Sequence, residues 1–103
     1  MIFSNNLSMQ PFEPLIAFYD AIADDVRITT THISLYMALL QQWNLNEGKS
    51  PIAITRDNIM RVAKISSRHT YNKCINQLQE YGYIQYMPSL SPFSYSIVYF
   101  KSL

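Results

Sequence analysis

The side chains best able to do chemistry gather in one short stretch of the chain, between residues 54 and 84. They are polar or basic and lie close together: Ser67, Arg68, His69, Asn72 and Lys73. Residues 1–48 carry one basic residue against five acidic ones, whereas residues 49–103 carry seven basic residues against two acidic ones. Because six of those seven lie between Lys49 and Lys73, this stretch is where a polyanion such as nucleic acid would bind.

Catalytic or metal chemistry needs clustered histidine, cysteine and carboxylate side chains, and the chain offers few. His32 and His69 are far apart in the sequence, and neither belongs to a paired metal-ligand spacing. Cys74 falls on the predicted buried face of a helix, where a small apolar side chain packs well. Asp24 and Asp25 are adjacent, so at a helix end their side chains point apart. We therefore expect no enzyme activity, no metal and no cofactor.

Two helices joined by a tight turn are expected to position the basic stretch. Thr55 is suited to cap the first helix. The apolar stripe of that helix comprises Ile59, Val62 and Ala63. The second helix begins at Ser66 or Ser67, either of which can accept a hydrogen bond from the first-turn amides, and it stops at Gly82. Its apolar face comprises Tyr71, Cys74, Ile75, Leu78 and Tyr81, which leaves the other face polar and basic.

Strands rich in Tyr, Ile, Val and Phe are expected after the second helix. The β-prone runs 83–87 and 95–101 are separated by the Pro- and Ser-containing connection 88–94, which predicts a hairpin. Residues 51–54 can form a further short strand that pairs with this hairpin.

Two scaffold helices are expected before the motif. The first runs from Phe12 to about Asp25, with acids opposite an apolar set at helical spacing: Phe12, Leu15, Ile16, Tyr19, Ile22 and Ala23. The second runs from about Thr31 to Asn44, after a threonine cluster able to cap it. Its apolar set is Ile33, Tyr36, Met37, Leu40 and Trp43. Both sets are predicted to lie in the core.

The order of these elements resembles the winged helix-turn-helix family, in which a two-stranded hairpin, the wing, directly follows a helix-turn-helix. The residues that carry the resemblance are Ile65-Ser66, Thr70-Tyr71, Cys74, Leu78 and Tyr81-Gly82-Tyr83-Ile84. The family is found in bacterial transcription regulators, in replication initiators and primosome proteins, and in accessory proteins of mobile elements. The resemblance implies a mainly α fold of the α+β class, with three to four helices and a two- to three-stranded antiparallel sheet.

The resemblance also implies how the chain would bind double-stranded DNA, because in this family the second helix of the motif lies in the major groove. The positions that match base-reading residues are Ser67, Arg68, His69, Asn72, Lys73 and Asn76. Arg68 suits a bidentate contact with guanine, and Asn72 one with adenine. The positions placed to hold phosphates are Thr55, Arg56, Asn58, Ser66, Thr70 and Lys73. The alternative for each is plain solvated surface.

The expected wing departs from the family pattern. Its loop, residues 88–94, has no Lys or Arg, whereas wings that enter the minor groove commonly present one. This favours an alternative function, a non-catalytic protein-interaction module. In that alternative Leu90, Phe93 and the tyrosines form an apolar contact surface.

Length and composition set the remaining expectations. With 103 residues, 49% of them apolar and 15% charged, the chain is predicted to form one folded domain. Its expected parts are an N-terminal arm (1–11), scaffold helices (12–50), the helix-turn-helix (51–82) and the wing hairpin (83–103). The apolar arm predicts a homodimer. No small-molecule ligand is evident, and no apolar run approaches the roughly 18 residues of a transmembrane helix, so a cytoplasmic location without membrane contact is expected.

Overall fold

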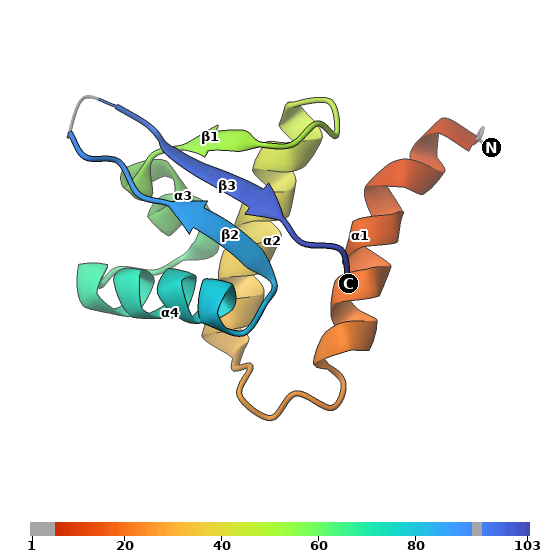
Figure 1. The fold of residues 1–103 in the computed structure, drawn as a ribbon, viewed down its shortest axis with the longest axis horizontal. Helices are drawn as coiled ribbons and strands as arrows, with labels where there is room; N and C mark the ends of the chain where they lie inside the picture. Colours follow the sequence, from red (N-terminus) through yellow and green to blue (C-terminus); the bar gives the residue numbers. More distant parts are fainter. Residues whose placement is uncertain (1–5, 92–93) are drawn as a thin grey trace.

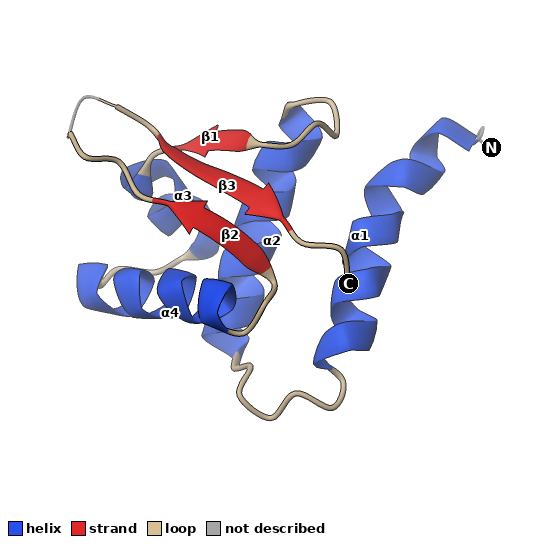
Figure 2. Ribbon diagram, viewed as in Figure 1, coloured by secondary structure: helices blue, strands red, loops and turns tan. Residues whose placement is uncertain are grey.

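A computed structural model describes residues 6–91 and 94–103, with side chains from Glu13 onward except those of residues 92 and 93. The elements along the chain are α1 (Asn6–Ile22), α2 (Thr30–Leu45), β1 (Ile52–Ile54), α3 (Arg56–Ala63), α4 (Arg68–Glu80), β2 (Ile84–Met87) and β3 (Ser96–Phe100). These described residues form four helices and one three-stranded sheet (Figure 1, Figure 2), which confirms the predicted α+β class. None of the helices in the described part of the chain is long and apolar enough to cross a membrane.

The strands form an antiparallel sheet in the order β1-β3-β2, so the last strand lies between the other two. Val98 of β3 is paired with Ile52 of β1 on one side and with Tyr86 of β2 on the other. Alternate side chains of a strand point to the same face, and the inward residues Ile52, Ile54, Ile84 and Val98 are buried. The strand β1 and the hairpin form as predicted, but all three strands begin one residue later than expected and β3 ends one residue earlier, at Phe100.

The second helix, α2, is surrounded by other elements. It packs against α3, α4 and β1, and it contacts α1 through Tyr36. Its buried residues are His32, Leu35, Tyr36, Ala38, Leu39 and Leu40. The single predicted stripe of α2 was too narrow, because it omitted the buried residues Leu35, Ala38 and Leu39. Three of its members are only partly buried, namely Ile33, Met37 and Trp43. A helix with neighbours on several sides is apolar over more than one stripe, which blurs the helical period.

A buried histidine joins the start of α2 to α4. The backbone N–H of Thr29 donates a 3.0 Å hydrogen bond to Nδ1 of His32, and the Thr29 hydroxyl oxygen accepts one from the His32 backbone. Because Nδ1 accepts, Nε2 carries the ring hydrogen and donates to Oε1 of Gln77 at 2.8 Å. His32 is therefore a structural link rather than a free surface group.

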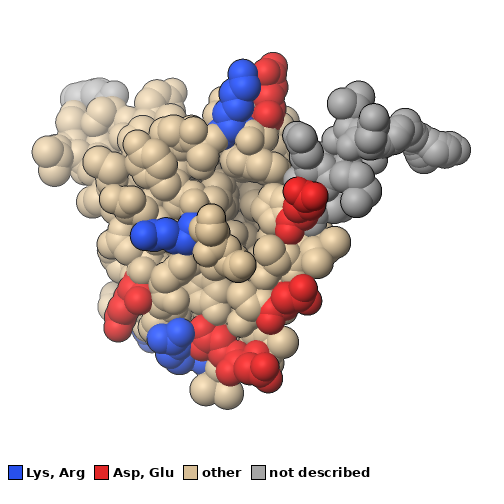
Figure 3. Space-filling view, turned by 45° about the vertical axis from the view of Figure 1, so that its right-hand side comes forward, with Lys and Arg blue, Asp and Glu red and all other residues tan. Residues whose placement is uncertain are grey.

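The boundaries of α1 differ from the prediction. The helix begins at Asn6 rather than near Phe12, and it ends at Ile22 rather than near Asp25. Part of the expected arm is thus helical, and residues 1–5 of the arm lie outside the described residues. Residues 7–10 are mostly good helix formers, which lets the helix extend back beyond the predicted start. Asp and Glu side chains line the side of α1 and the connector that follows it (Figure 3).

The predicted core face of α1 was only partly right: Leu15 and Ile22 pack against the core, whereas Ala23 is exposed and the side chain of Phe12 lies outside the described residues. Phe18, which the predicted stripe omitted, is fully buried and stacks on Tyr36 with ring centroids 3.8 Å apart. Ile16 and Tyr19, predicted to be core, are 57% and 47% exposed. The apolar residues of α1 form two neighbouring stripes at helical spacing, and the one with Leu15, Phe18 and Ile22 faces the core.

A polar cluster fastens the connector between α1 and α2 to the end of α4 and the start of β2. The Asp25 carboxylate accepts hydrogen bonds from Nε and Nη2 of Arg27, at 2.8 and 2.9 Å, and from the hydroxyl of Tyr83 at 2.6 Å. The Arg27 guanidinium lies 4.2 Å from the ring centroid of Tyr81, a cation–π contact. The connector is therefore held in place by side chains rather than left as a free loop.

Candidate nucleic-acid interface

Local hydrogen bonds explain where α3 begins and ends. The Thr55 hydroxyl oxygen accepts a hydrogen bond from the backbone N–H of Asn58 at 3.3 Å, which confirms Thr55 as the N-cap. After Ala63 the chain reverses at Lys64, whose φ of +63° is left-handed, and Ile65 N–H bonds to the Met60 carbonyl at 2.9 Å. Lys64 therefore ends α3 and opens the tight turn that leads to α4.

The start and end of α4 are equally local. Ser67, one of the two predicted caps, accepts a 3.2 Å hydrogen bond from Thr70 N–H. At the other end Gly82 has φ +92°, and Tyr83 N–H bonds to the Leu78 carbonyl at 2.9 Å, which closes the helix at Glu80. Four of the five predicted apolar residues of α4 are buried: Tyr71, Cys74, Ile75 and Leu78. Cys74 is a packed side chain because it is buried in this face, and the burial raises the pKa of its thiol.

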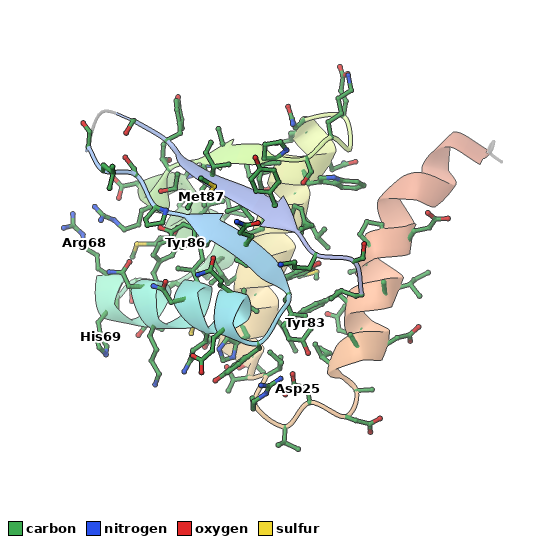
Figure 4. The ribbon with its side chains drawn as sticks, viewed as in Figure 1. Asp25, Arg68, His69, Tyr83, Tyr86 and Met87 are labelled. Carbon is green, nitrogen blue, oxygen red and sulfur yellow. The ribbon has the colours of Figure 1, made fainter. Side chains whose placement is uncertain are left out.

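Most of the predicted DNA-contacting residues are exposed. On α4 and the turn before it, the exposed ones are Ser66, Ser67, Arg68, His69, Asn72, Lys73 and Asn76, and on the α3 side they are Thr55 and Arg56. Asn58 and Thr70 are half-buried. Arg68 and His69 project from the N-terminal end of α4, Arg68 toward the side of the strands and His69 away from the sheet (Figure 4). The first turn of α4 therefore presents side chains in two directions.

Several of these side chains are already engaged within the protein. The Asn76 amide donates to the Asn72 carbonyl at 2.7 Å, one turn earlier on the same helix. Arg61 Nη2 donates to the Asn58 side-chain oxygen at 2.6 Å. Asn58 and Asn76 are therefore less available to an external ligand than their exposure or position implies.

The basic side chains of α4, by contrast, have no acidic partner in the part of the chain that the structure describes. Among the described residues, Arg68 and Lys73 make no ion pair, and the nearest pair on this side joins Arg56 to Asp57 at 3.8 Å. That pair is solvent-exposed, and exposed pairs contribute little, about 0–1 kcal/mol. The positive charge on this side of the molecule is thus largely uncompensated.

The tertiary structure adds a groove that the sequence did not indicate. A hollow of about 630 Å³ lies between the start of α3, the N-terminal half of α4 and the hairpin loop. Its lining includes Thr55, Arg56, Asp57, Tyr71, Asn72, Tyr86 and Ser96. The groove thus unites two predicted phosphate-holding residues and one predicted base-reading residue with residues of the hairpin.

Two tyrosines in the groove were missed by the sequence reasoning as site residues. Tyr71 is almost fully buried, and burial, with a smaller contribution from Tyr86, raises its pKa above the ordinary value. Its hydroxyl therefore stays protonated as a hydrogen-bonding group. The sequence marked Tyr71 as an apolar core residue, and no local signal placed Tyr86 beside it, because the two come from different elements.

The loop between β2 and β3 is organised by serine hydroxyls rather than by charge. Ser89 N–H donates to the Ser96 hydroxyl at 3.0 Å, and the hydroxyls of Ser89 and Ser94 lie 2.6 Å apart. Leu90 in the same loop is fully exposed. The loop borders the groove without bringing a cation to it.

The chain matches no protein-family model, and no curated protein and no solved structure shows significant similarity to it.

Proposed function

We propose that this protein is a double-stranded DNA-binding module of the winged helix-turn-helix kind. The order α2-β1-α3-α4-β2-β3 and the sheet order β1-β3-β2 support this proposal, with α3 and α4 as the helix-turn-helix and the β2–β3 hairpin as the wing. Its role would be that of a transcription regulator or a replication or mobile-element accessory protein, in the cytoplasm and without catalytic activity. These roles share the same contact chemistry.

The proposal rests on the side chains that the N-terminal half of α4 exposes. One face of this helix is buried, while the other exposes Arg68, Asn72 and Lys73 without an acidic partner among the described residues. A helix of this kind fits the major groove, where Arg recognises guanine and Asn recognises adenine. We assign base reading to the segment from Ser67 to Lys73 and leave out Asn76, because its amide already donates to its own helix.

The start of α3 supplies the contacts that would orient the helix. Thr55 and Arg56 are exposed at the α3 N-terminus and line the same groove as Asn72. A sugar-phosphate strand that crosses this groove would meet Arg56 and the backbone amides of the first helical turn. Ser66 and Thr70, on the turn and on α4, are the remaining proposed phosphate contacts.

Salt-dependent binding tests the proposal directly. Fluorescence anisotropy with a short random duplex should show binding at about 50 mM salt, and log K should fall with log salt at a slope of roughly −4 for four to five neutralised phosphates. The variant Lys49→Ala serves as a control, because it removes one charge from the α2–β1 loop, which lies away from this face (Figure 1). It should bind the duplex as the natural chain does. Absence of binding at low salt, or a slope near zero, would refute the proposal.

A second candidate function is supported by the hairpin. Leu90 is fully exposed, and Met87, Tyr95 and Tyr99 are also exposed apolar side chains on or beside its strands. A non-catalytic protein-interaction module would use such a surface. An intact chain that binds neither duplex nor single-stranded DNA at low salt would favour this candidate.

We also propose a homodimer that is held by the N-terminal residues. The apolar residues that motivate it precede Glu13, and their side chains lie outside the described part of the chain. Two copies would present their α4 helices to successive major grooves about 34 Å apart. Light scattering on the intact chain and on a chain without residues 1–10 tests this. A monomeric intact chain at high concentration would remove the dimer and leave the DNA proposal standing.

A further inference from the structure

The first helix carries an apolar stripe that the described residues leave about half exposed. Leu15, Phe18 and Ile22 face the core, and the neighbouring stripe contains Ile16 and Tyr19, which are 57% and 47% exposed. Large apolar side chains exposed on one stripe of a helix commonly mark an interaction surface.

Acidic side chains border this stripe along one side. Glu13 and Asp20 on α1, and Asp24 in the turn just after it, are exposed, and none of them forms an ion pair with another described residue. Residues 1–26 contain no Lys or Arg. The nearest cation in sequence, Arg27, is committed to Asp25. We call the set Glu13, Ile16, Tyr19, Asp20 and Asp24 the acidic stripe.

The charges of the acidic stripe indicate which class of molecule can bind to it. Nucleic acid and anionic membranes are repelled by three unpaired carboxylates. A second copy of α1 would bring two such acidic rows together, because the helix has no cation to pair with them. A helix with an apolar stripe flanked by Lys or Arg is complementary in both shape and charge.

We propose that the acidic stripe is a docking surface for a basic amphipathic helix of another protein. Apolar side chains of that helix cover Ile16 and Tyr19, and its Lys or Arg residues pair with the three carboxylates. Figure 1 shows α1 on the right of the molecule and the N-terminal end of α4 on the left, with α2 and the sheet between them. Both surfaces can therefore be occupied at once, and the inference holds whether or not the protein binds DNA.

Labelled helical peptides test the proposal on the intact chain. The probe peptide has a leucine stripe flanked by lysines; one control has glutamates in place of the lysines, and another has the same residues in an order without a stripe. The probe should saturate and bind at least about tenfold more tightly than either control. Equal binding of the probe and the reordered control would mean charge attraction without a docking surface and would overturn the proposal.

Variants of the exposed residues locate the site. Ile16→Ser combined with Tyr19→Ser should weaken probe binding at least about tenfold. Thermal stability should fall only modestly, because both side chains are about half exposed and the Tyr19 ring contacts Phe18 edge-on. The matched control is Leu45→Ser, which changes an exposed leucine on α2 and should leave probe binding unchanged. Glu13→Gln with Asp20→Asn and Asp24→Asn should weaken binding and its salt dependence. Unchanged binding in the Ile16 and Tyr19 variant, or an intact-chain dimer that this variant abolishes, would contradict the assigned occupant.

Discussion

The hydroxyl of Tyr83 donates a 2.6 Å hydrogen bond to the carboxylate of Asp25, which lies 58 positions earlier in the chain. The same carboxylate accepts two hydrogen bonds from Arg27. These bonds connect the segment after α1 to Tyr83, the residue just before β2. The placement of α1 and the direction in which β2 starts are therefore coupled through one carboxylate.

This coupling predicts a specific pH dependence of stability. Hydrogen bonds from Arg27, and then from Tyr83, hold the pKa of Asp25 well below its usual range. Because the folded-state pKa lies below the unfolded one, the stabilisation is present at neutral pH and is lost as the pH falls below about 4. Asp25→Asn should lower the free energy of unfolding at about pH 7, and its difference from the natural chain should shrink near pH 2.

Urea unfolding at the two pH values measures this, with Asp24→Asn as the control. Asp24 is exposed and is adjacent to Asp25, so its variant should show almost the same stability as the natural chain at both pH values. An Asp25→Asn effect that is the same at pH 7 and pH 2 would argue against the pairing.

At alkaline pH the complementary effect involves Tyr83, because burial and then the Asp25 hydrogen bond raise its pKa to about 12. The stabilisation that Tyr83 contributes is lost as the pH rises toward that value.

The packing of α1 predicts that substitutions at two apolar residues, two positions apart, cost very different amounts of stability. Phe18→Ala removes a fully buried ring from its stack on Tyr36, and it should cost about 3–5 kcal/mol. Ile16→Ala changes an exposed side chain and should stay within about 0.5 kcal/mol. Chemical denaturation of both variants distinguishes the two stripes. Equal costs would show that α1 docks differently.

The proposed DNA interface predicts a difference in kind between two arginines. Arg68→Ala should cost about 1–3 kcal/mol at a preferred site and reduce discrimination among sequences. Arg56→Ala should weaken binding to all sequences similarly and make the salt slope shallower by about 1, as expected for a phosphate contact. Titrations of both variants on a selected site and on random duplex separate these outcomes. Identical losses of affinity on both DNAs for both variants would show that the base-reading face has been assigned wrongly.

The fully exposed Leu90 allows a test of whether the hairpin loop approaches DNA. If the loop lies beside a phosphate strand, Leu90→Lys should tighten binding and steepen the salt slope by about 1. Leu90→Asp should weaken binding. Neither variant should alter stability by more than about 0.5 kcal/mol, because the side chain has no packing to lose. Unchanged DNA binding in both variants would place the loop away from the duplex.

The sequence by itself determined the two helices α3 and α4, the tight turn between them and the strands that follow. The cap at Thr55, a serine cap at Ser66 or Ser67 and the left-handed Gly82 all act within a few residues, and the structure chose Ser67, which accepts from Thr70 N–H. Local hydrogen bonds and backbone preferences do not depend on the rest of the fold. The buried face of α4 was readable for a related reason, because only one side of that helix is covered.

Only the tertiary structure decided which stripe of α1 became core, how far burial spread around α2, and which residues meet in the groove. Phe18 and Ile16 belong to equally regular stripes, and the choice between them depends on where Tyr36 and Tyr83 lie. Arg56, Asn72 and Ser96 line one groove because α3 and α4 both pack against α2, and α4 also packs against the sheet through β2. The Tyr83–Asp25 bond likewise exists only after the two ends of the fold have met, since no local pattern links residues so far apart in the chain.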